Sequence, residues 1–198
     1  MIAELFAGAR RVLSGLVGTD EAYLSVAQAQ GPMEYATHQG SVFMASQQAA
    51  AAFGTALTAT AVTLTLYNPK GSGKRLIVLS IGAAVVTATT AGFLVAAINA
   101  PGIAEPTGVT PLASGIQNAK VGAGSGVGLV YSAATLIATP VARRLVGGIL
   151  STTPGGVNLI RDNVNGAIEL LEGAALTIQG VTTNATGLID LLWEEKDL

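Results

Sequence analysis

Residues 55–86, TALTATAVTLTLYNPKGSGKRLIVLSIGAAVV, carry the clearest strand pattern of the chain. In residues 55–67, Thr alternates with Ala, Leu and Val, which predicts a strand with one apolar face and one hydroxyl face. A phase slip near Ala61 suits a β-bulge. The polar turn of residues 68–74 ends this strand, and the apolar run 75–86 predicts a second, buried strand. The two strands form either an antiparallel hairpin or a corner between two sheets.

Further candidate strands are short runs rich in Val, Ile, Leu and Thr, bounded by turn residues. They cover residues 42–44, 91–98, 129–137, 168–171, 175–181 and 187–194. Residues 141–150 fit a strand or a short helix, and residues 100–128, rich in Gly, Pro, Ser and Thr, predict a long ordered loop. Roughly eight strands at this spacing predict a mainly β protein, a β-sandwich of the jelly-roll type.

The first thirty residues have a helical period. We predict a short helical N-terminal arm over residues 1–32 and a β-sandwich domain over residues 33–198. A second arm helix is expected to end where Gly31 and Pro32 break it, and strand period is expected from Tyr35 onward. The arm either folds back on its own body or binds a partner through its apolar stripe and the arginines beside it. The predicted partner-binding residues are Ile2, Leu5, Phe6, Arg10, Arg11, Leu13 and Leu16.

Composition excludes several classes of function. The 198 residues are 50% hydrophobic and 11% charged, with a net charge of −2, one His and no Cys. Without Cys there is no disulfide, no thiolate metal site and no thiol nucleophile. A nearly neutral balance argues against a nucleic-acid partner. Residues 76–104 carry no charge, but their β-branched residues and glycines indicate buried strands, so no membrane partner is expected.

Two glycine-rich segments resemble nucleotide-binding motifs and fail when compared position by position. In residues 68–75, Asn68 occupies the first Gly of GxxxxGK[ST], and Arg75 replaces the hydroxyl residue that holds magnesium. In residues 122–131, the last Gly of GxGxxG is missing in every frame, and the segment around Ser125 lacks both glycines of GxSxG. We therefore predict ordinary turns in both places and expect no cofactor.

Metal and catalytic sites also fail. Residues 161–172 follow part of a calcium-loop pattern, but Arg161 occupies the first position, where a carboxylate is required. The one imidazole, His38, has no recognisable acidic partner beside Ser41 or Ser46 in the sequence. Glu169 with Glu172, and Glu194 with Glu195, are candidate carboxylate pairs, but strand alternation places adjacent Glu residues on opposite faces. The pattern predicts no catalytic site.

Three segments resemble a group of tailed-bacteriophage virion structural proteins. They are YATHQGSVF (35–43), LYNPKGSGK (66–74) and LEGAALTIQG (171–180), the last followed by a strand that ends in LWEE (192–195). In this group a Pro-Gly pair usually precedes the penultimate strand, and here Glu172-Gly173 takes that place. The resemblance implies a jelly-roll capsid cement or decoration subunit, often trimeric, with no catalytic residues.

Charge patterning supports an assembly role. From Tyr35 to Ala119 the formal charges are Lys70, Lys74, Arg75 and Glu105. Such neutral surfaces are typical of faces buried between subunits. We therefore expect a homo-oligomer, a trimer, that sits on the capsid surface of a virion and bridges copies of the major capsid protein. The alternatives are a phage tail, baseplate or host-recognition subunit, and a carbohydrate-active or hydrolytic enzyme.

Overall fold

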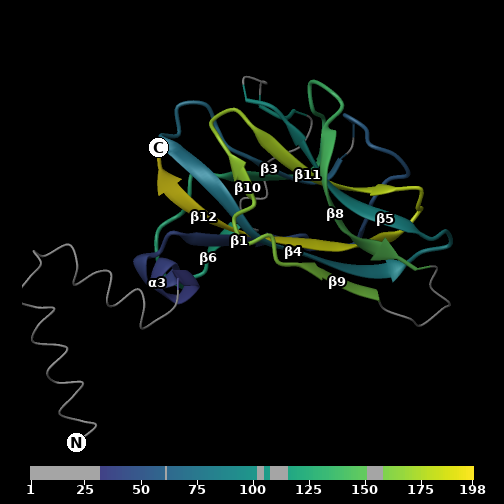
Figure 1. Ribbon diagram of the computed structural model, residues 1–198, viewed down its shortest axis with the longest axis horizontal. Helices are drawn as coiled ribbons and strands as arrows, with labels where there is room; N and C mark the ends of the chain where they lie inside the picture. The colour runs from purple at the N-terminus through teal and green to yellow at the C-terminus, as the bar shows by residue number, and fades with distance from the viewer. Residues whose placement is uncertain (1–31, 61, 102–104, 108–115, 151–157) are drawn as a thin grey trace, which may run out of the picture. The chain divides into compact units, whose positions relative to one another are not determined.

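Strands dominate the part of the chain that the computed structural model describes (Figure 1). The described residues are 32–60, 62–101, 105–107, 116–150 and 158–198. The chain divides into two compact units, residues 1–39 and residues 40–198. Within the first unit, helix α3 (Pro32–Gln39) is described. The seven predicted partner-binding residues lie outside the described residues, so the helical arm stays a prediction.

Helix α3 corrects the strand period that was expected from Tyr35 onward. The expected end of a second arm helix falls before Pro32, outside the described residues, and Pro32 is the first residue of α3. Proline is favoured at this position because the first backbone N–H of a helix needs no partner inside the helix. Residues 35–39 are therefore helical, and strand structure begins at Val42 instead of near Tyr35. Gly40, with a φ of 75°, separates the helix from the first strand.

The second unit consists of two antiparallel sheets that pack as a β-sandwich. The first sheet, sheet A, has the order β10-β4-β12-β1-β6, with β2 paired to β12 and β9 paired to β4. Its strands are β1 (Val42–Ser46), β2 (Ala51–Ala52), β4 (Lys74–Thr87), β6 (Ile116–Asn118), β9 (Asn158–Asp162), β10 (Ile168–Leu170) and β12 (Thr186–Asp197). Sheet B has the order β7-β3-β11-β5-β8. Its strands are β3 (Val62–Tyr67), β5 (Gly92–Asn99), β7 (Leu129–Ala134), β8 (Val141–Ile149) and β11 (Ala175–Val181).

The segment from residue 55 to residue 86 is a corner between the sheets. Strand β3 belongs to sheet B and β4 to sheet A, which decides between the two predicted arrangements. The strand prediction was wrong for residues 55–60, which have no strand structure. The backbone N–H of Thr58 instead donates to Gln179 Oε1 at 2.9 Å, and Gln179 Nε2 donates to the Thr58 carbonyl at 3.0 Å. These bonds fasten residues 55–60 to β11 of sheet B.

The other long strands confirm their predictions within a few residues, including β4 and β5 in the charge-free region 76–104. Residues 141–150 form a strand, β8. The loop predicted over residues 100–128 contains the short strand β6, so that prediction was wrong in part. Strand β9 was not predicted. Within the described residues, no helix has the length and apolar composition needed to cross a membrane.

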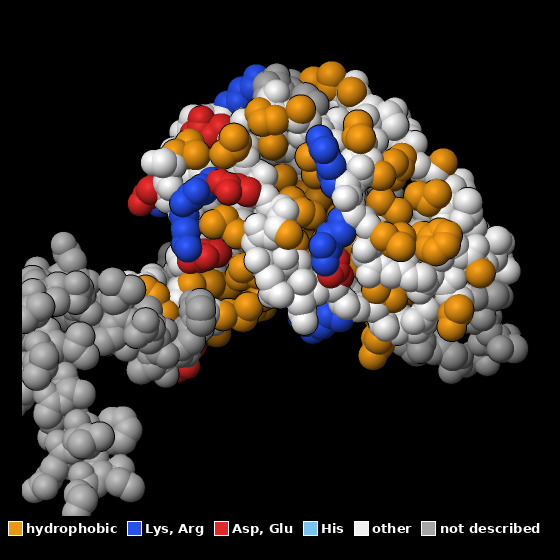
Figure 2. Space-filling view, viewed as in Figure 1, with side chains coloured by type: hydrophobic (Ala, Val, Ile, Leu, Met, Phe, Trp, Pro, Cys, Tyr) orange, Lys and Arg blue, Asp and Glu red, His pale blue; other side chains and the backbone are white. Residues whose placement is uncertain are grey.

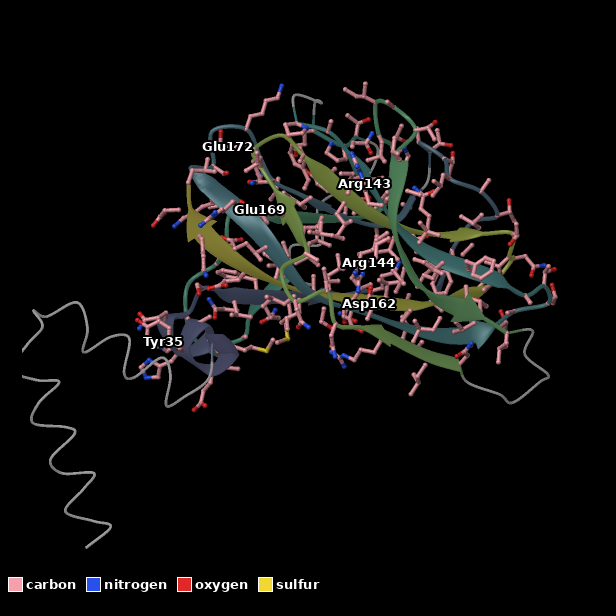
Figure 3. All side chains as sticks on the ribbon, viewed as in Figure 1. Tyr35, Arg143, Arg144, Asp162, Glu169 and Glu172 are labelled. Atoms are coloured by element: carbon pink, nitrogen blue, oxygen red, sulfur yellow. The ribbon has the colours of Figure 1, made fainter. Side chains whose placement is uncertain are left out.

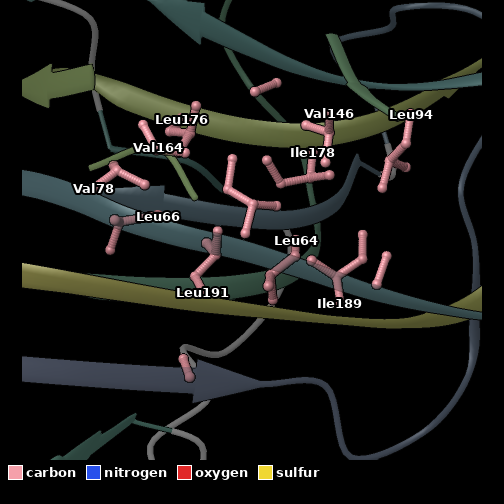
Figure 4. Packing of buried hydrophobic residues seen from close by; sticks show 14 of the residues in the cluster. Leu64, Leu66, Val78, Leu94, Val146, Val164, Leu176, Ile178, Ile189 and Leu191 are labelled. Atoms are coloured by element: carbon pink, nitrogen blue, oxygen red, sulfur yellow. The ribbon is translucent and has the colours of Figure 1, made fainter. Parts of the chain in front are cut away.

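The main core lies between the two sheets (Figure 4). Alternate residues of β3, β11 and β5 face alternate residues of β4 and β12 across it. Phe43 and Trp193 stack with ring centroids 6.1 Å apart. The largest completely buried side chains include Trp193, Tyr131, Phe53, Leu64, Leu66, Leu76, Ile81, Leu94, Ile149, Leu170, Leu176 and Ile178.

Candidate functional site

The glycine-rich turn after β3 is held by a buried asparagine. Asn68 Nδ2 donates to the carbonyls of Lys74 at 2.8 Å and Leu170 at 2.9 Å, and Asn68 Oδ1 accepts from Ser72 Oγ at 2.7 Å. The position where a phosphate loop requires Gly is therefore filled by a side chain that fixes the turn. The predicted turn is confirmed, and the hydrogen bonds of the Asn68 side chain stabilise it.

The Glu172 carboxylate already accepts a hydrogen bond from a backbone N–H that a bound phosphate would need. Glu172 Oε1 accepts from the N–H of Gly73 at 2.6 Å. The ammonium group of Lys74 pairs with Asp197 at 2.6 Å. A bound phosphate would have to displace the first of these carboxylates and compete with the second. The Gly73 N–H and the Lys74 ammonium group therefore already have carboxylate partners.

The segment that resembles a calcium loop directs its side chains to separate partners. Asp162 accepts two hydrogen bonds from Arg144, from Nε at 2.5 Å and from Nη2 at 2.8 Å. Arg161 lies 3.9 Å from Asp190, and Glu172 bonds to Gly73. Figure 3 shows Asp162 beside Arg144, away from Glu172. Among the described residues, no group of three or more His, Asp or Glu side chains is placed to hold a metal ion.

The two C-terminal glutamates point to opposite faces of β12, as strand alternation predicts. Glu195 is buried and accepts from the N–H groups of Val127 and Gly128, both at 2.9 Å, and from Trp193 Nε1 at 3.2 Å. Glu194 lies on the other face, where it accepts from Ser41 Oγ at 3.4 Å. Ser41 therefore has an acidic partner that was not recognised in the sequence, because the two residues are 153 positions apart.

The outer face of sheet B carries buried hydroxyl groups. Thr65 and Thr177 are completely buried, and Tyr131 donates a hydrogen bond to Glu105. Burial, together with the nearby carboxylate of Glu105, raises the pKa of Tyr131 above its ordinary value. Burial and the same carboxylate also raise the pKa of Tyr67. These tyrosines are neutral structural groups at physiological pH.

One end of the sandwich is free of charge and exposes apolar side chains. We call it the uncharged end and define it as residues 84–95, 145–150, 158–160 and 179–189, which include no Asp, Glu, Lys or Arg. Its segments are neighbours, because β5 pairs with β8 and β11 while β4 pairs with β9 and β12. Its exposed large apolar residues are Val86 and Leu159 on the outer side of sheet A, Phe93 and Leu145 on the outer side of sheet B, and Leu150 just after β8. On the face in Figure 2, charged side chains lie nearer the end that holds the C-terminal residues.

The sequence analysis did not single out the uncharged end as a surface. Leu159 lies on β9, which was not predicted, and Leu145 lies on β8, which was left as strand or helix. The available signal was the absence of charge from residues 145–160 and 173–189. Neutral segments far apart in sequence can be assigned to one end of the sandwich only once strand pairing is known.

No family model, no curated protein and no solved structure matches this chain.

Proposed function

We propose that this chain is a non-enzymatic structural subunit of a tailed-bacteriophage virion, a cement or decoration protein on the capsid surface. The observation that carries the proposal is a surface poor in charge that exposes several large apolar side chains. Such a surface is favourable when it is buried against other subunits and costly when it stays in water. A structural role uses this surface directly and requires no catalytic group.

The strand order supports a jelly-roll fold for the sandwich. Sheet A contains the series β1-β12-β4-β10, and sheet B contains β3-β11-β5-β8. Strands β3, β4 and β5 alternate between the sheets, as they would in a chain wound through two four-stranded sheets. Strands β6 and β7 extend one edge of each sheet. Jelly rolls with two four-stranded sheets recur in viral capsid proteins, and this proposal uses that likeness only as support.

Two of the segments that carry the phage resemblance are joined in space. The N–H of Asn68 donates to the Ala174 carbonyl at 3.0 Å, and the N–H of Gly173 donates to the Asn68 carbonyl at 2.7 Å. The Glu172 carboxylate adds its bond to Gly73. The resemblance at residues 66–74 and 171–180 thus falls on segments that are hydrogen-bonded to each other.

We expect the subunit to be a homo-oligomer, a trimer, because its neutral strands require protein partners. Light scattering without detergent tests this expectation. A stable monomer at micromolar concentration would contradict it. Electron microscopy of purified particles then tests the location: density on the head supports a cement role, and density on the tail or baseplate supports the alternative of a tail or host-recognition subunit.

The proposed bridge to the major capsid protein is the N-terminal arm, through Ile2, Leu5, Phe6, Arg10, Arg11, Leu13 and Leu16. Deletion of residues 1–30 is expected to leave a folded, β-rich oligomer that no longer attaches firmly to its particle, because no described strand is removed. Cosedimentation with particles measures attachment. The bridging role is wrong if the truncated chain aggregates while a full-length Arg10→Ala, Arg11→Ala variant still binds.

A further inference from the structure

Asn165 and Gly166 are the central residues of the turn that joins β9 to β10 (Figure 1). The N–H of Ala167 donates to the Val164 carbonyl at 3.0 Å, and the φ angles of Asn165 and Gly166 are 51° and 81°. Positive φ at both central positions is the geometry of a type I′ turn, which Asn and Gly adopt readily. The segment that resembled part of a calcium loop therefore contains a tight turn with an Asn-Gly pair at its centre.

The side-chain amide of Asn165 is exposed and makes no hydrogen bond within the described part of the chain. The chain has seven asparagines, and five of them hold their side chains in hydrogen bonds with other parts of the sandwich: Asn68, Asn99, Asn118, Asn158 and Asn184. The remaining two, Asn163 and Asn165, are both exposed. They differ in the next residue, which is the branched Val164 after Asn163 and Gly166 after Asn165.

We propose that Asn165 is a site of spontaneous backbone modification, at which it is converted into aspartate and isoaspartate. The backbone nitrogen of Gly166 loses its proton to base and attacks Asn165 Cγ. The bond from Cγ to Nδ2 breaks, ammonia leaves, and a five-membered succinimide ring forms. Water then opens the ring at either carbonyl, which gives aspartate or, where the main chain now passes through Cγ, isoaspartate. Gly166 favours the attack because no Cβ hinders the approach of its nitrogen.

Hydrogen bonds to β4 oppose this reaction in the folded protein. The N–H of Asn165 donates to the Leu79 carbonyl at 2.9 Å, and the N–H of Gly166 donates to the Val78 carbonyl at 2.8 Å. The attacking nitrogen is therefore free only while the turn is separated from β4. Among the described strands, β9 and β10 pair with β4 alone, and such an edge opens at lower cost than the core. Local opening of this edge therefore controls the rate.

The modification also removes what holds the turn to β4. A succinimide nitrogen carries no hydrogen, so the bond from Gly166 to the Val78 carbonyl is lost when the ring forms. Isoaspartate restores the N–H but adds one atom to the main chain, and a two-residue turn cannot keep its geometry with that extra atom. The edge of sheet A is then held by the pairing of β9 and β10 with β4, without the turn between them. The change runs in one direction, because no step restores the amide.

The test follows the full chain by peptide mass spectrometry during incubation at mildly alkaline pH, both folded and unfolded in urea. In the folded protein, Asn165 is expected to convert at least about tenfold faster than Asn163, because Val164 is branched at Cβ and Gly166 has no side chain. Asn163 is the internal control, because it is exposed and lies two residues away. Fragmentation of the peptide that contains residue 165 distinguishes isoaspartate from aspartate.

Two variants separate the reaction from its consequence. Asn165→Gly removes the amide and tolerates a φ of 51°, so it is expected to fold and to stay unchanged at this peptide. Asn163→Asp adds the same negative charge to the same segment without lengthening the main chain. Isoaspartate-containing chains, purified by ion exchange, are expected to have a lower urea midpoint than Asn163→Asp.

Faster conversion at Asn165, an unchanged Asn165→Gly and a lowered urea midpoint of the isoaspartate chains support the proposal. An Asn165 that stays intact in the folded chain while the urea-unfolded chain is fully converted overturns it, because the bonds to β4 then block the reaction. Equal rates at Asn163 and Asn165 also overturn it. An isoaspartate chain as stable as Asn163→Asp overturns the release of the turn. The proposed virion role is independent of all these outcomes.

Discussion

Asn68 is buried and bonds to two backbone carbonyls, whereas Lys74 of the same turn makes an exposed ion pair. Its side chain joins the two ends of one turn and also reaches Leu170, 102 residues later. We predict that Asn68→Ala lowers the free energy of unfolding by about 3 kcal/mol, because buried carbonyl groups lose their donor. Urea denaturation at neutral pH measures the change.

Lys74→Ala is the control in the same turn. Its ion pair with Asp197 is largely exposed, so we expect a change of no more than about 0.5 kcal/mol and no change in any nucleotide affinity. Equal losses for the two variants would show that the turn is not fixed by Asn68. A large loss of ATP binding in Lys74→Ala would show that the phosphate-loop resemblance is functional.

Single residues could be predicted from the sequence where their partners are close by. The turn at residues 68–74 follows from its Asn, Pro and Gly residues alone. The role of Glu195 does not, because its partners Val127 and Gly128 lie 68 and 67 positions away. A Cβ on Gly126 would lie 2.4 Å from Glu195 Oε1, so a glycine that resembled part of a nucleotide motif makes room for this carboxylate.

At the level of elements, the pairing of β12 with β4 depends on a strand glycine. A Cβ at Gly187 would lie 2.1 Å from the Ala84 carbonyl oxygen and 2.7 Å from the Phe53 ring. Backbone of a central strand cannot move aside easily, so Gly187→Ala is predicted to cost about 3 kcal/mol. Thermal unfolding followed by circular dichroism checks this value.

Gly124→Ala makes the same chemical change where a Cβ would meet nothing within 4 Å. We expect its stability to stay within about 0.5 kcal/mol of wild type. If Gly187→Ala is equally mild, the close approach of β12 to β4 is not a constraint on the fold.

The elements that the sequence predicted well are long or strongly apolar. Strand β11 coincides with its predicted range because the apolar Leu176 and Ile178 alternate with the polar Thr177 and Gln179. Strands β2, β6 and β9 have two, three and five residues and were missed because they combine short length with small or polar residues, whereas the equally short β10 was predicted from Ile168 and Leu170. Residues 55–60 alternate like a strand, yet the backbone N–H and carbonyl of Thr58 pair with the Gln179 side chain instead of with a neighbouring strand.

At the scale of the whole molecule, the buried tyrosines of sheet B predict that stability is lost at alkaline pH. The pKa values of Tyr131 and Tyr67 are raised above 10.0 in the folded state, so folding favours their protonated forms. Stability is therefore fully present below pH 10 and is lost as pH rises toward the raised pKa values. Urea midpoints measured from pH 7 to pH 11 should fall only above about pH 10.

Tyr131→Phe is expected to make this fall shallower, because one of the two titrating groups is removed. The variant also loses the hydrogen bond to Glu105, so its stability at pH 7 should be about 1 kcal/mol lower than that of wild type. Ser132→Ala, the next residue on β7, adds and removes no titrating group in this range and serves as control. Parallel pH profiles for wild type and Tyr131→Phe would contradict the assignment.

The β-sandwich could be predicted by counting strands in the sequence, but which residues share an end of it could not. Alternation in residues 62–67 predicts which side faces the core, and Leu64 and Leu66 are completely buried there. The uncharged end combines segments from four parts of the chain, and only their pairing places them together.

The position of β12 also has a consequence for synthesis on the ribosome. This strand is the last in sequence order, but it lies between β4 and β1 in the middle of sheet A. Until residues 186–197 leave the exit tunnel, β1 and β4 lack their common neighbour, and the core lacks Trp193. Sheet A therefore cannot be completed before residues 186–197 are free to pair, and its folding is slow, since its decisive contacts join strands far apart in sequence.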